Sequence, residues 1–375
     1  MVLRNAGYPE LANRIKEEDK RITVYGAGMI GRIVIPYIVE AYGLQEYVDC
    51  FVDSDSRKQG QEILVGSFRY EIRGMEILSR LEKNSVLLIT TSRFYQVLDC
   101  LDGIPELRDT EAYLVPVMQL EASERAKKFG IHRFLDTPVI PKKIHYCWFS
   151  EKPMPLFLQE CVQSWRELCP DYEIKEWNEK NYDVADIPYV EEAYKNGSYG
   201  FVADVARLDI LYQYGGVYLD TDVTLLKSLD ELLYQPAFVG VEKWGNINTG
   251  GGCGAVAHHP MIREMLEYRK CFHFLQKDGS RDTATNGLYE TIPFLRHGMK
   301  VDNTMQIING VTIYPSCVFH PYDYMSCEDS RTEATIAKHH FYGGWMDKQE
   351  LHDRQDTQRM YRSILKRMKC GTDIA

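Results

Sequence analysis

The sequence contains no apolar run long enough to cross a bilayer. A membrane-spanning helix needs about 20 predominantly apolar residues, and no stretch of this chain approaches that length. The N-terminal residues MVLRNAGYPELANRIKEEDK are polar and lack the apolar core of a secretory signal. We therefore expect a cytoplasmic protein, with the inner face of a membrane as the only membrane location that remains open.

Cysteine pairs with metal-ligand spacing are also absent. The chain has ten cysteines, but none of them form a C-x-x-C pair, so the spacing gives no indication of a zinc site. In a chain without a secretory signal, such cysteines are most simply reduced thiols.

The charge lacks the pattern of a nucleic-acid-binding protein. The formal net charge is −10, and no basic stripe with interleaved aromatic residues is present, so we expect no nucleic acid partner. The remaining composition, 45% hydrophobic and 26% charged, is typical of a globular protein. A length of 375 residues predicts two domains.

Residues 21–118 show the alternation of strands and helices that is typical of a βαβ domain. The strand-like Arg21–Tyr25 (RITVY) runs directly into GAGMIG, which is followed by a helical pattern over Arg32–Ala41. A second strand-like run, Tyr47–Val52, ends at an aspartate 22 residues past the last glycine. This spacing matches the dinucleotide-binding fingerprint. The sequence predicts a Rossmann-like domain over residues 1–120, with a candidate second nucleotide site at Gly26, Gly28, Gly31 and Asp53.

Three interpretations of this glycine loop stay open. Its backbone N–H groups could face the phosphate of a nicotinamide cofactor, or of another nucleotide or regulatory ligand, at a helix N-terminus. The same glycines would also serve close strand–helix packing in a structural or oligomerising lobe. The segment resembles the N-terminal domains of bacterial sugar acyltransferases of the pilin-glycosylation type, where GAGxxG and a following FVDxD occur in a lobe that is not a dehydrogenase; Phe51–Asp55 (FVDSD) fits that pattern.

The most informative stretch is Ala203–Asp222, ADVARLDILYQYGGVYLDTD. Its first twelve residues have apolar side chains at helical spacing, and Gly215-Gly216 then ends the helix. The β-prone Val217–Leu219 leads to two acids, Asp220 and Asp222. An Asp-x-Asp pair at the end of a strand offers oxygen ligands to a hard divalent cation such as Mg²⁺ or Mn²⁺.

This stretch resembles the core of the DXD-containing retaining glycosyltransferases, A-[SD]-x-x-R-x-x-x-L-x-x-x-G-G-x-Y-x-D-x-D. That group includes capsular-polysaccharide and yeast mannosyltransferase-type enzymes (family 32) and, more distantly, the catalytic domains of clostridial glucosylating toxins. The resemblance implies an α/β protein with a GT-A nucleotide-diphospho-sugar transferase domain over residues 139–346. It also implies Mn²⁺ or Mg²⁺, a nucleotide-sugar donor (UDP favoured), a glycan or lipid-linked glycan acceptor, retention of configuration, and a role in bacterial surface polysaccharide synthesis.

The resemblance also implies roles for the residues of this stretch. Asp220 and Asp222 would hold the metal, and Tyr218 would belong to the substrate-binding set. Asp204 and Arg207, three residues apart on one helix face, would hold the donor sugar and orient its diphosphate. A structural salt bridge between these last two residues is the alternative, and the two roles are compatible.

Four further positions match the family outside this stretch. Ile140–Phe149 (IPKKIHYCWF) resembles the family's opening strand, whose tryptophan, here Trp148, stacks on the nucleobase; a core tryptophan is the alternative. Asn181 in WNEKN would contact the nucleoside, or cap a turn. Asn248, before a run of glycines, would lie near the anomeric carbon. His339 matches a family histidine at the metal or diphosphate, and the neighbouring histidine at 340 is the weaker candidate.

The remaining segments are less specific. Ala284–Tyr289 (ATNGLY) departs from the family's T-G-P acceptor loop, which leaves the acceptor contacts open. Residues 121–138 predict a charged linker helix and residues 347–375 a basic C-terminal helix. The basic face over 347–370 would allow peripheral membrane contact, but the helix could equally pack on the protein. The sequence leaves open whether the protein forms homo-oligomers.

Two other classes of function are compatible with parts of the chain. A nicotinamide-dependent sugar-nucleotide oxidoreductase would use the glycine loop, although Tyr8, Tyr25 and Tyr37 lack a lysine four residues on. A non-catalytic nucleotide-sugar sensor would keep the binding residues without turnover.

Overall fold

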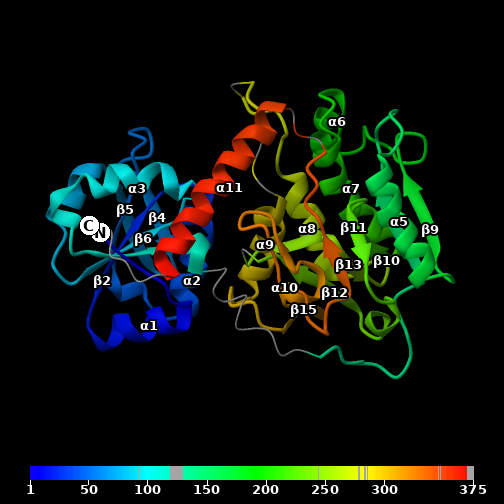
Figure 1. Cartoon of the computed structure of the whole chain (residues 1–375), viewed down its shortest axis with the longest axis horizontal. Coiled ribbons are helices and arrows are strands. Elements are labelled where there is room, and N and C mark those ends of the chain that lie inside the picture. Colours follow the sequence, from blue (N-terminus) through cyan, green and yellow to red (C-terminus); the bar gives the residue numbers. More distant parts are fainter. Residues whose placement is uncertain are drawn as a thin grey trace. The chain divides into compact units, whose positions relative to one another are not determined.

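The computed structural model describes residues 1–91, 93–118, 130–243, 245–277, 279–282, 284, 286–344, 346 and 348–369. These residues form two compact units (Figure 1). The first unit lies within Met1–Arg125, Lys300–Asp302 and His352–Ala375, and the second within Ala126–Met299 and Asn303–Leu351. No described helix is both long and apolar enough to span a membrane.

The first unit is built on an open, mostly parallel sheet with the strand order β1-β7-β6-β2-β3-β5-β4. Only the hairpin of β4 and β5 is antiparallel. The central strands are continuous apolar runs because helices cover both faces of such a sheet. The strands are β1 (Val2–Arg4), β2 (Arg21–Tyr25), β3 (Val48–Val52), β4 (Glu62–Val65), β5 (Phe68–Arg73), β6 (Ser85–Ile89) and β7 (Glu111–Leu114); the α-helices are α1 (Tyr8–Glu17), α2 (Ile35–Ala41) and α3 (Phe94–Asp102).

The second unit contains a mixed sheet with the order β14-β15-β12-β13-β10-β8-β9. Its strands are β8 (Lys143–Cys147), β9 (Glu173–Trp177), β10 (Gly216–Tyr218), β12 (Ala237–Val241), β13 (Ile247–Ala255), β14 (Gln306–Ile308) and β15 (Val311–Tyr314). A separate pair joins β11 (Val223–Leu225) to β18 (Ala337–His339), and a short one joins β16 (Tyr322–Asp323) to β17 (Glu328–Asp329). The expectation of an α/β protein is confirmed.

Six helices accompany the sheets of the second unit, and a seventh ends the described chain (Figure 1). They are α5 (Leu156–Leu168), α6 (Pro188–Lys195), α7 (Tyr199–Tyr214), α8 (Pro260–Lys270), α9 (Asn286–Arg296), α10 (Ser316–Phe319) and the terminal α11 (Lys348–Lys369). The C-terminal end of α7 lies where the sequence predicts it, but the helix begins at Tyr199, four residues before the predicted start at Ala203. It ends where Gly215 and Gly216 take φ angles of 63° and 102°, which other residues adopt only with strain.

The topology brings distant residues to one edge of the second sheet. Strands β8 and β10 are parallel neighbours, so Trp148 and Asp220, which follow them, lie at the same edge. Strand β18 pairs with β11 so that His339 lies opposite Val223. A residue from the C-terminal part of the chain is thereby placed next to Asp222.

The linker helix predicted over 121–138 needs correction. Residues 119–129 lie outside the described residues, and residues 130–138 form no helix. Instead, the backbone N–H groups of Phe134 and Leu135 both donate to the carbonyl of Tyr234, and Arg133 forms a bidentate pair with Glu231. These tertiary contacts hold the segment in an irregular conformation against the second unit.

The C-terminal helix α11 belongs largely to the first unit, as the packing alternative predicts. The ring of Tyr361 is fully buried and lies 5.4 Å from that of Phe94. The hydroxyl of Thr357 is 2.9 Å from that of Tyr95. The helix therefore buries Tyr361 and Ile364 inside the protein, whereas Arg359, Arg362 and Lys366 are exposed.

Candidate functional site

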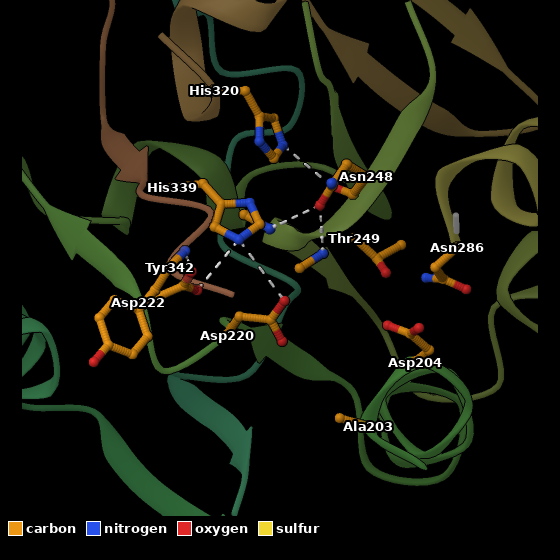
Figure 2. Close-up of polar contacts among 12 residues, drawn as sticks. Ala203, Asp204, Asp220, Asp222, Asn248, Thr249, Asn286, His320, His339 and Tyr342 are labelled. Atoms are coloured by element: carbon orange, nitrogen blue, oxygen red, sulfur yellow. Dashed lines mark hydrogen bonds and ion pairs between the residues drawn. The ribbon is translucent and has the colours of Figure 1, made fainter. Parts of the chain in front are cut away.

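Asp220, Asp222 and His339 form a cluster whose candidate ligand atoms all lie within 4.8 Å of one another (Figure 2). The Nε2 atom of His339 is 3.2 Å from Oδ1 of Asp222 and 4.0 Å from Oδ2 of Asp220. Two carboxylates and one imidazole form a donor set that suits a divalent cation such as Mn²⁺, and incoming oxygens could complete its shell. The residues predicted to hold a metal are thus brought together.

The geometry of Asp222 is fixed by the strand that carries His339. The backbone N–H of Tyr342 donates to Oδ2 of Asp222 at 2.7 Å, and that of His340 donates to the Asp222 carbonyl. Burial alone would raise the pKa of Asp222, but the charge of His339 and its hydrogen bond lower this pKa to about 2. The same pair raises the pKa of His339 against the effect of its burial. The two side chains therefore attract each other as an ion pair, and His339 would have to release its proton to bind a cation.

Arg207 connects the helix α7 to the first aspartate of the motif. Its Nη2 atom lies 2.8 Å from Oδ1 of Asp204 and 3.1 Å from Oδ1 of Asp220. Its Nε donates to the carbonyl of Ala203, so the guanidinium is held at several points. Only 5% of Arg207 is exposed, which means that its charge acts in a poorly solvated environment.

Asp204 is half-buried, whereas Tyr218 is completely buried. Burial raises the pKa of Asp204 to about 6, although Arg207 opposes this rise. Tyr218 is fully buried; its hydroxyl donates to Oδ1 of Asp220, and its ring lies beneath Arg207. Tyr218 therefore orients these two residues, and its burial does not support the predicted contact with a substrate.

The loop of Asn248 fits closely around the aspartate. Asn248 Oδ1 accepts hydrogen bonds from the backbone N–H groups of Gly250 and Gly251 at 3.0 and 3.2 Å, and its Nδ2 donates to Glu242. The Gly250 carbonyl accepts a hydrogen bond from the N–H of Asp220. Asn248 lies near His339 in Figure 2, but its amide is mainly engaged in shaping this loop.

Trp148 and Asn181 are predicted to contact the nucleoside. Trp148 follows β8 at the site edge of the sheet, is half-buried, and donates its indole N–H to the carbonyl of Lys152. Asn181 closes the loop after β9 through the Glu176 carbonyl and the Asn178 N–H.

Asn181 lines a cavity of about 150 Å³ together with Asp209. Asp209 lies about 140° around α7 from Asp204, at about 100° per residue. The hydrogen bonds of Asn181 agree with the turn-capping alternative, and its contact with the nucleoside stays a prediction.

Of the two adjacent histidines, only His339 faces the cluster. The Nε2 atom of His340 is 2.9 Å from the hydroxyl of Thr224, and its ring packs edge-on against Phe157. The alternation of side chains along an extended strand turns His340 to the opposite side.

Sequence reasoning missed Glu290 and Thr249. Glu290 on α9 is 1% exposed and accepts hydrogen bonds from the backbone N–H and the hydroxyl of Thr249 and from the amide of Asn286. Burial raises the pKa of Glu290 to about 7. The sequence offers one local indication for Glu290 alone: in GLYETIPFL this glutamate is the only charged residue in an apolar run.

The predicted nucleotide loop of the first unit is partly explained by packing. A Cβ on Gly31 would lie 1.8 Å from the Gly26 carbonyl oxygen, whereas a Cβ on Gly28 would meet nothing within 4 Å. Asp53 Oδ2 accepts the N–H of Ala27 at 2.7 Å and pairs with Lys58. The acid thus holds the loop itself, and only Gly28 leaves space for a ligand.

Comparison with known proteins identifies the segment that carries α7 and the DXD motif. Residues 155–239 match the family described as the glycosyltransferase sugar-binding region containing DXD motif. This match includes Asp204, Arg207, Asp220 and Asp222, but neither Trp148 nor the residues of β13 and β18. The chain therefore carries a DXD-containing glycosyltransferase region.

Curated relatives are similar over the same part of the chain. Inositol phosphoceramide mannosyltransferase 3 of Schizosaccharomyces pombe is 33% identical over 36% of this chain and 38% of its own length. The Saccharomyces cerevisiae mannosyl phosphorylinositol ceramide synthase SUR1 is 31% identical over 35% of each chain. An uncharacterized glycosyltransferase, L373, of Acanthamoeba polyphaga mimivirus is 26% identical over 55% of this chain and 84% of its own. The chain thus spans well under half the length of the two fungal relatives.

Proposed function

We propose that this protein is a metal-dependent glycosyltransferase that moves a sugar from a nucleotide-sugar donor to a glycan or lipid-linked acceptor. The observation that carries this proposal is the position of Arg207, which pairs with Asp204 on one side and with Asp220 of the metal cluster on the other. A sugar diphosphate presents both hydroxyl groups and negative charge. The arrangement offers a carboxylate to the first and a cation to the second.

The chemistry requires stabilisation of a leaving diphosphate. As the bond to the anomeric carbon breaks, negative charge develops on the diphosphate and positive charge on the sugar. A divalent cation held by Asp220, Asp222 and His339 would neutralise the diphosphate as it departs. Arg207 adds a second, permanent positive charge, because its guanidinium cannot lose its proton. Asp204, fixed by Arg207, would orient the sugar hydroxyls.

We further propose retention of configuration, with the acceptor attacking from the face that the leaving group vacates. The other buried carboxylate near Arg207, that of Glu290, is engaged by Thr249 and Asn286, which makes it unsuited to act as a nucleophile. UDP is the favoured nucleoside diphosphate and Trp148 the favoured platform for its base.

The acceptor is proposed from the relatives. The names of the fungal proteins describe mannosyl transfer to inositol phosphoceramide, which favours a lipid-linked acceptor, and surface polysaccharide synthesis in bacteria is the setting that we keep from the motif resemblance. We also keep the cytoplasm as the proposed location. The basic surface of α11 would provide peripheral contact with the inner face of a membrane, and homo-oligomers remain part of the proposal.

We propose that the first unit is a Rossmann-like lobe that binds a nucleotide or related ligand at Gly28. Gly31 serves packing, and Asp53 is bonded to Ala27 and Lys58, so a dinucleotide ribose would have to displace an existing contact. This favours the transferase over an oxidoreductase. A bound nicotinamide, detected by its absorbance in the purified protein, would reverse that preference.

A panel of nucleotide sugars tests the proposal. Each donor is added with Mn²⁺, the melting temperature is recorded, and release of the nucleoside diphosphate is followed. One donor should stabilise the protein and be hydrolysed slowly even without an acceptor. Stabilisation without any turnover, with or without membrane-lipid and glycan acceptors, would favour the non-catalytic sensor. The anomeric configuration of the released sugar, read by NMR before mutarotation, tests retention.

A further inference from the structure

We propose that Glu290 is a positioning residue that holds Arg207 for the diphosphate and Asn286 for the donor sugar without contacting the substrate. This inference rests on the proposed function, because it assigns a task in binding the donor. Glu290 is 1% exposed, so it has no access to a ligand. Its role has to pass through the residues that it contacts.

One path from Glu290 leads to the metal cluster. Glu290 Oε2 accepts the backbone N–H of Thr249 at 2.9 Å, and Oε1 accepts the Thr249 hydroxyl proton. The Thr249 oxygen, with its proton committed to the carboxylate, presents a lone pair to Nη1 of Arg207 at 3.5 Å. Arg207 in turn pairs with Asp220 at 3.1 Å. A continuous set of contacts therefore links α9 to the DXD motif.

The second path leads to Asn286, the first residue of α9. Its Nδ2 donates to Glu290 Oε1 at 2.5 Å, and the amide plane then turns Oδ1 to the opposite side. This buried Oδ1 has no hydrogen-bond partner among the described residues. Asn286, Thr249 and Asp204 point toward the same region in Figure 2. An unpaired buried acceptor is unfavourable, and a hydroxyl group of the donor sugar is a donor that would satisfy it.

The carboxylate of Glu290 can hold Thr249 and Asn286 together because both of its oxygens accept hydrogen bonds. It must accept from three donors at once, two of Thr249 and one of Asn286. A glutamine in its place has a single acceptor oxygen and an amide that itself donates. Glu290→Gln would therefore turn either Asn286 or Thr249 away, although it keeps the shape of the side chain.

Two sets of variants test the inference by hydrolysis of the nucleotide sugar that wild-type protein turns over. In the first set, Glu290→Gln is compared with Glu267→Gln, an exposed glutamate of α8 paired with Lys270. We expect Glu290→Gln to lower kcat/KM about 30-fold or more, since a misplaced group costs up to about 100-fold. Its affinity for the nucleoside diphosphate with Mn²⁺ should fall less than kcat/KM does, because the metal ligands still hold the diphosphate whereas the contact of Asn286 with the sugar is lost. Glu267→Gln should match wild type in both measurements.

The second set guards against a folding defect in the first. Thr249→Ser keeps the hydroxyl that links Glu290 to Arg207, and Thr249→Val removes it at nearly constant volume. Thr249→Ser should retain most of the wild-type kcat. Thr249→Val should lower kcat about tenfold or more, and a tenfold change corresponds to about 1.4 kcal/mol. Equal rates in the two variants, or wild-type kcat/KM in Glu290→Gln, would overturn the inference. Absence of turnover in wild-type protein with every donor would instead contradict the proposed function, on which the inference depends.

Discussion

Gly250 packs directly against the carboxylate of Asp220, since a Cβ atom on Gly250 would lie 2.0 Å from Oδ2 of Asp220. The same Cβ would lie 2.8 Å from Nη1 of Arg207. The glycine run that follows Asn248 is thereby explained by the close approach of charged side chains of the site. A side chain at this position would have to move the metal-binding carboxylate or the arginine.

We therefore predict that Gly250→Ala lowers turnover about 100-fold, the loss typical of a displacement of about 1 Å in an active site. Binding of Mn²⁺, measured by titration calorimetry, should weaken as well, because Asp220 is one of the three ligands. Gly130→Ala is the matched control, since its Cβ would make only an ordinary contact, 3.6 Å from His132 Nε2. Wild-type Mn²⁺ affinity and turnover in Gly250→Ala would show that the loop is not packed against Asp220 in this way.

Trp148 gives a prediction on nucleotide affinity. If the indole stacks on the base, Trp148→Ala should weaken binding of the nucleoside diphosphate about tenfold or more, since stacking contributes about 1–3 kcal/mol per base. Trp148→Phe should keep most of the affinity because it retains an aromatic face. A core role predicts the opposite pattern, in which Trp148→Ala lowers the melting temperature while the affinity measured for the folded protein is unchanged.

The pH dependence follows from two buried acids whose pKa values are raised, that of Asp204 to about 6 and that of Glu290 to about 7. Both act as acceptors of hydrogen bonds in the site, so kcat/KM should rise with pH through this interval. A carboxyl whose pKa is raised by folding contributes stability at low pH, which is lost as pH rises through the folded-state value.

These two groups should therefore make the protein less stable over the same pH interval in which activity increases. A pH series of kcat/KM, with the melting temperature recorded in parallel, checks the expected rise in activity and the expected fall in stability. A rate that is constant from about pH 5 to pH 8 would contradict the assignment of ionised Asp204 and Glu290 to the active form.

The packing of α11 gives a prediction on stability. Tyr361 is fully buried next to Phe94, and replacing a large buried aromatic residue by alanine costs about 3–5 kcal/mol. Tyr361→Ala should lower the free energy of unfolding of the first unit by about this amount in a denaturant titration, whereas Arg362→Ala, at an exposed neighbour, should have little effect. Equal midpoints for the two variants would indicate that α11 is not docked on the first unit.

The motif predicts the centre of the site better than its surroundings. The paired glycines predict the C-terminal end of α7 correctly, because a helix stop is a local property of the chain, whereas the helix begins four residues before the predicted Ala203. Asp220, Asp222 and His339 are also brought together as the family resemblance implies. Glu290 was missed since its partner Thr249 lies 41 residues away, and no local pattern indicates that two such polar groups will be buried together.

The error in the predicted linker has a physical origin that a single sequence does not display. The prediction covered residues 121–138 as one charged helix, but residues 130–138 form no helix. Hydrogen bonds to Tyr234 and the ion pair of Arg133 with Glu231 hold that segment instead. These are tertiary contacts with residues about 100 positions away along the chain.

The measurement that tests the central claim most directly is the rate of nucleoside diphosphate release before and after removal of divalent metal. Wild-type protein with its preferred nucleotide sugar should lose turnover in excess chelator and regain it when Mn²⁺ is restored. Asp222→Asn should stay inactive in both conditions at a temperature at which it is folded, although its melting temperature should fall because the ion pair with His339 is lost. Undiminished release in excess chelator, or wild-type activity in Asp222→Asn, would contradict the account of Asp220, Asp222 and His339 as the metal centre of a glycosyltransferase.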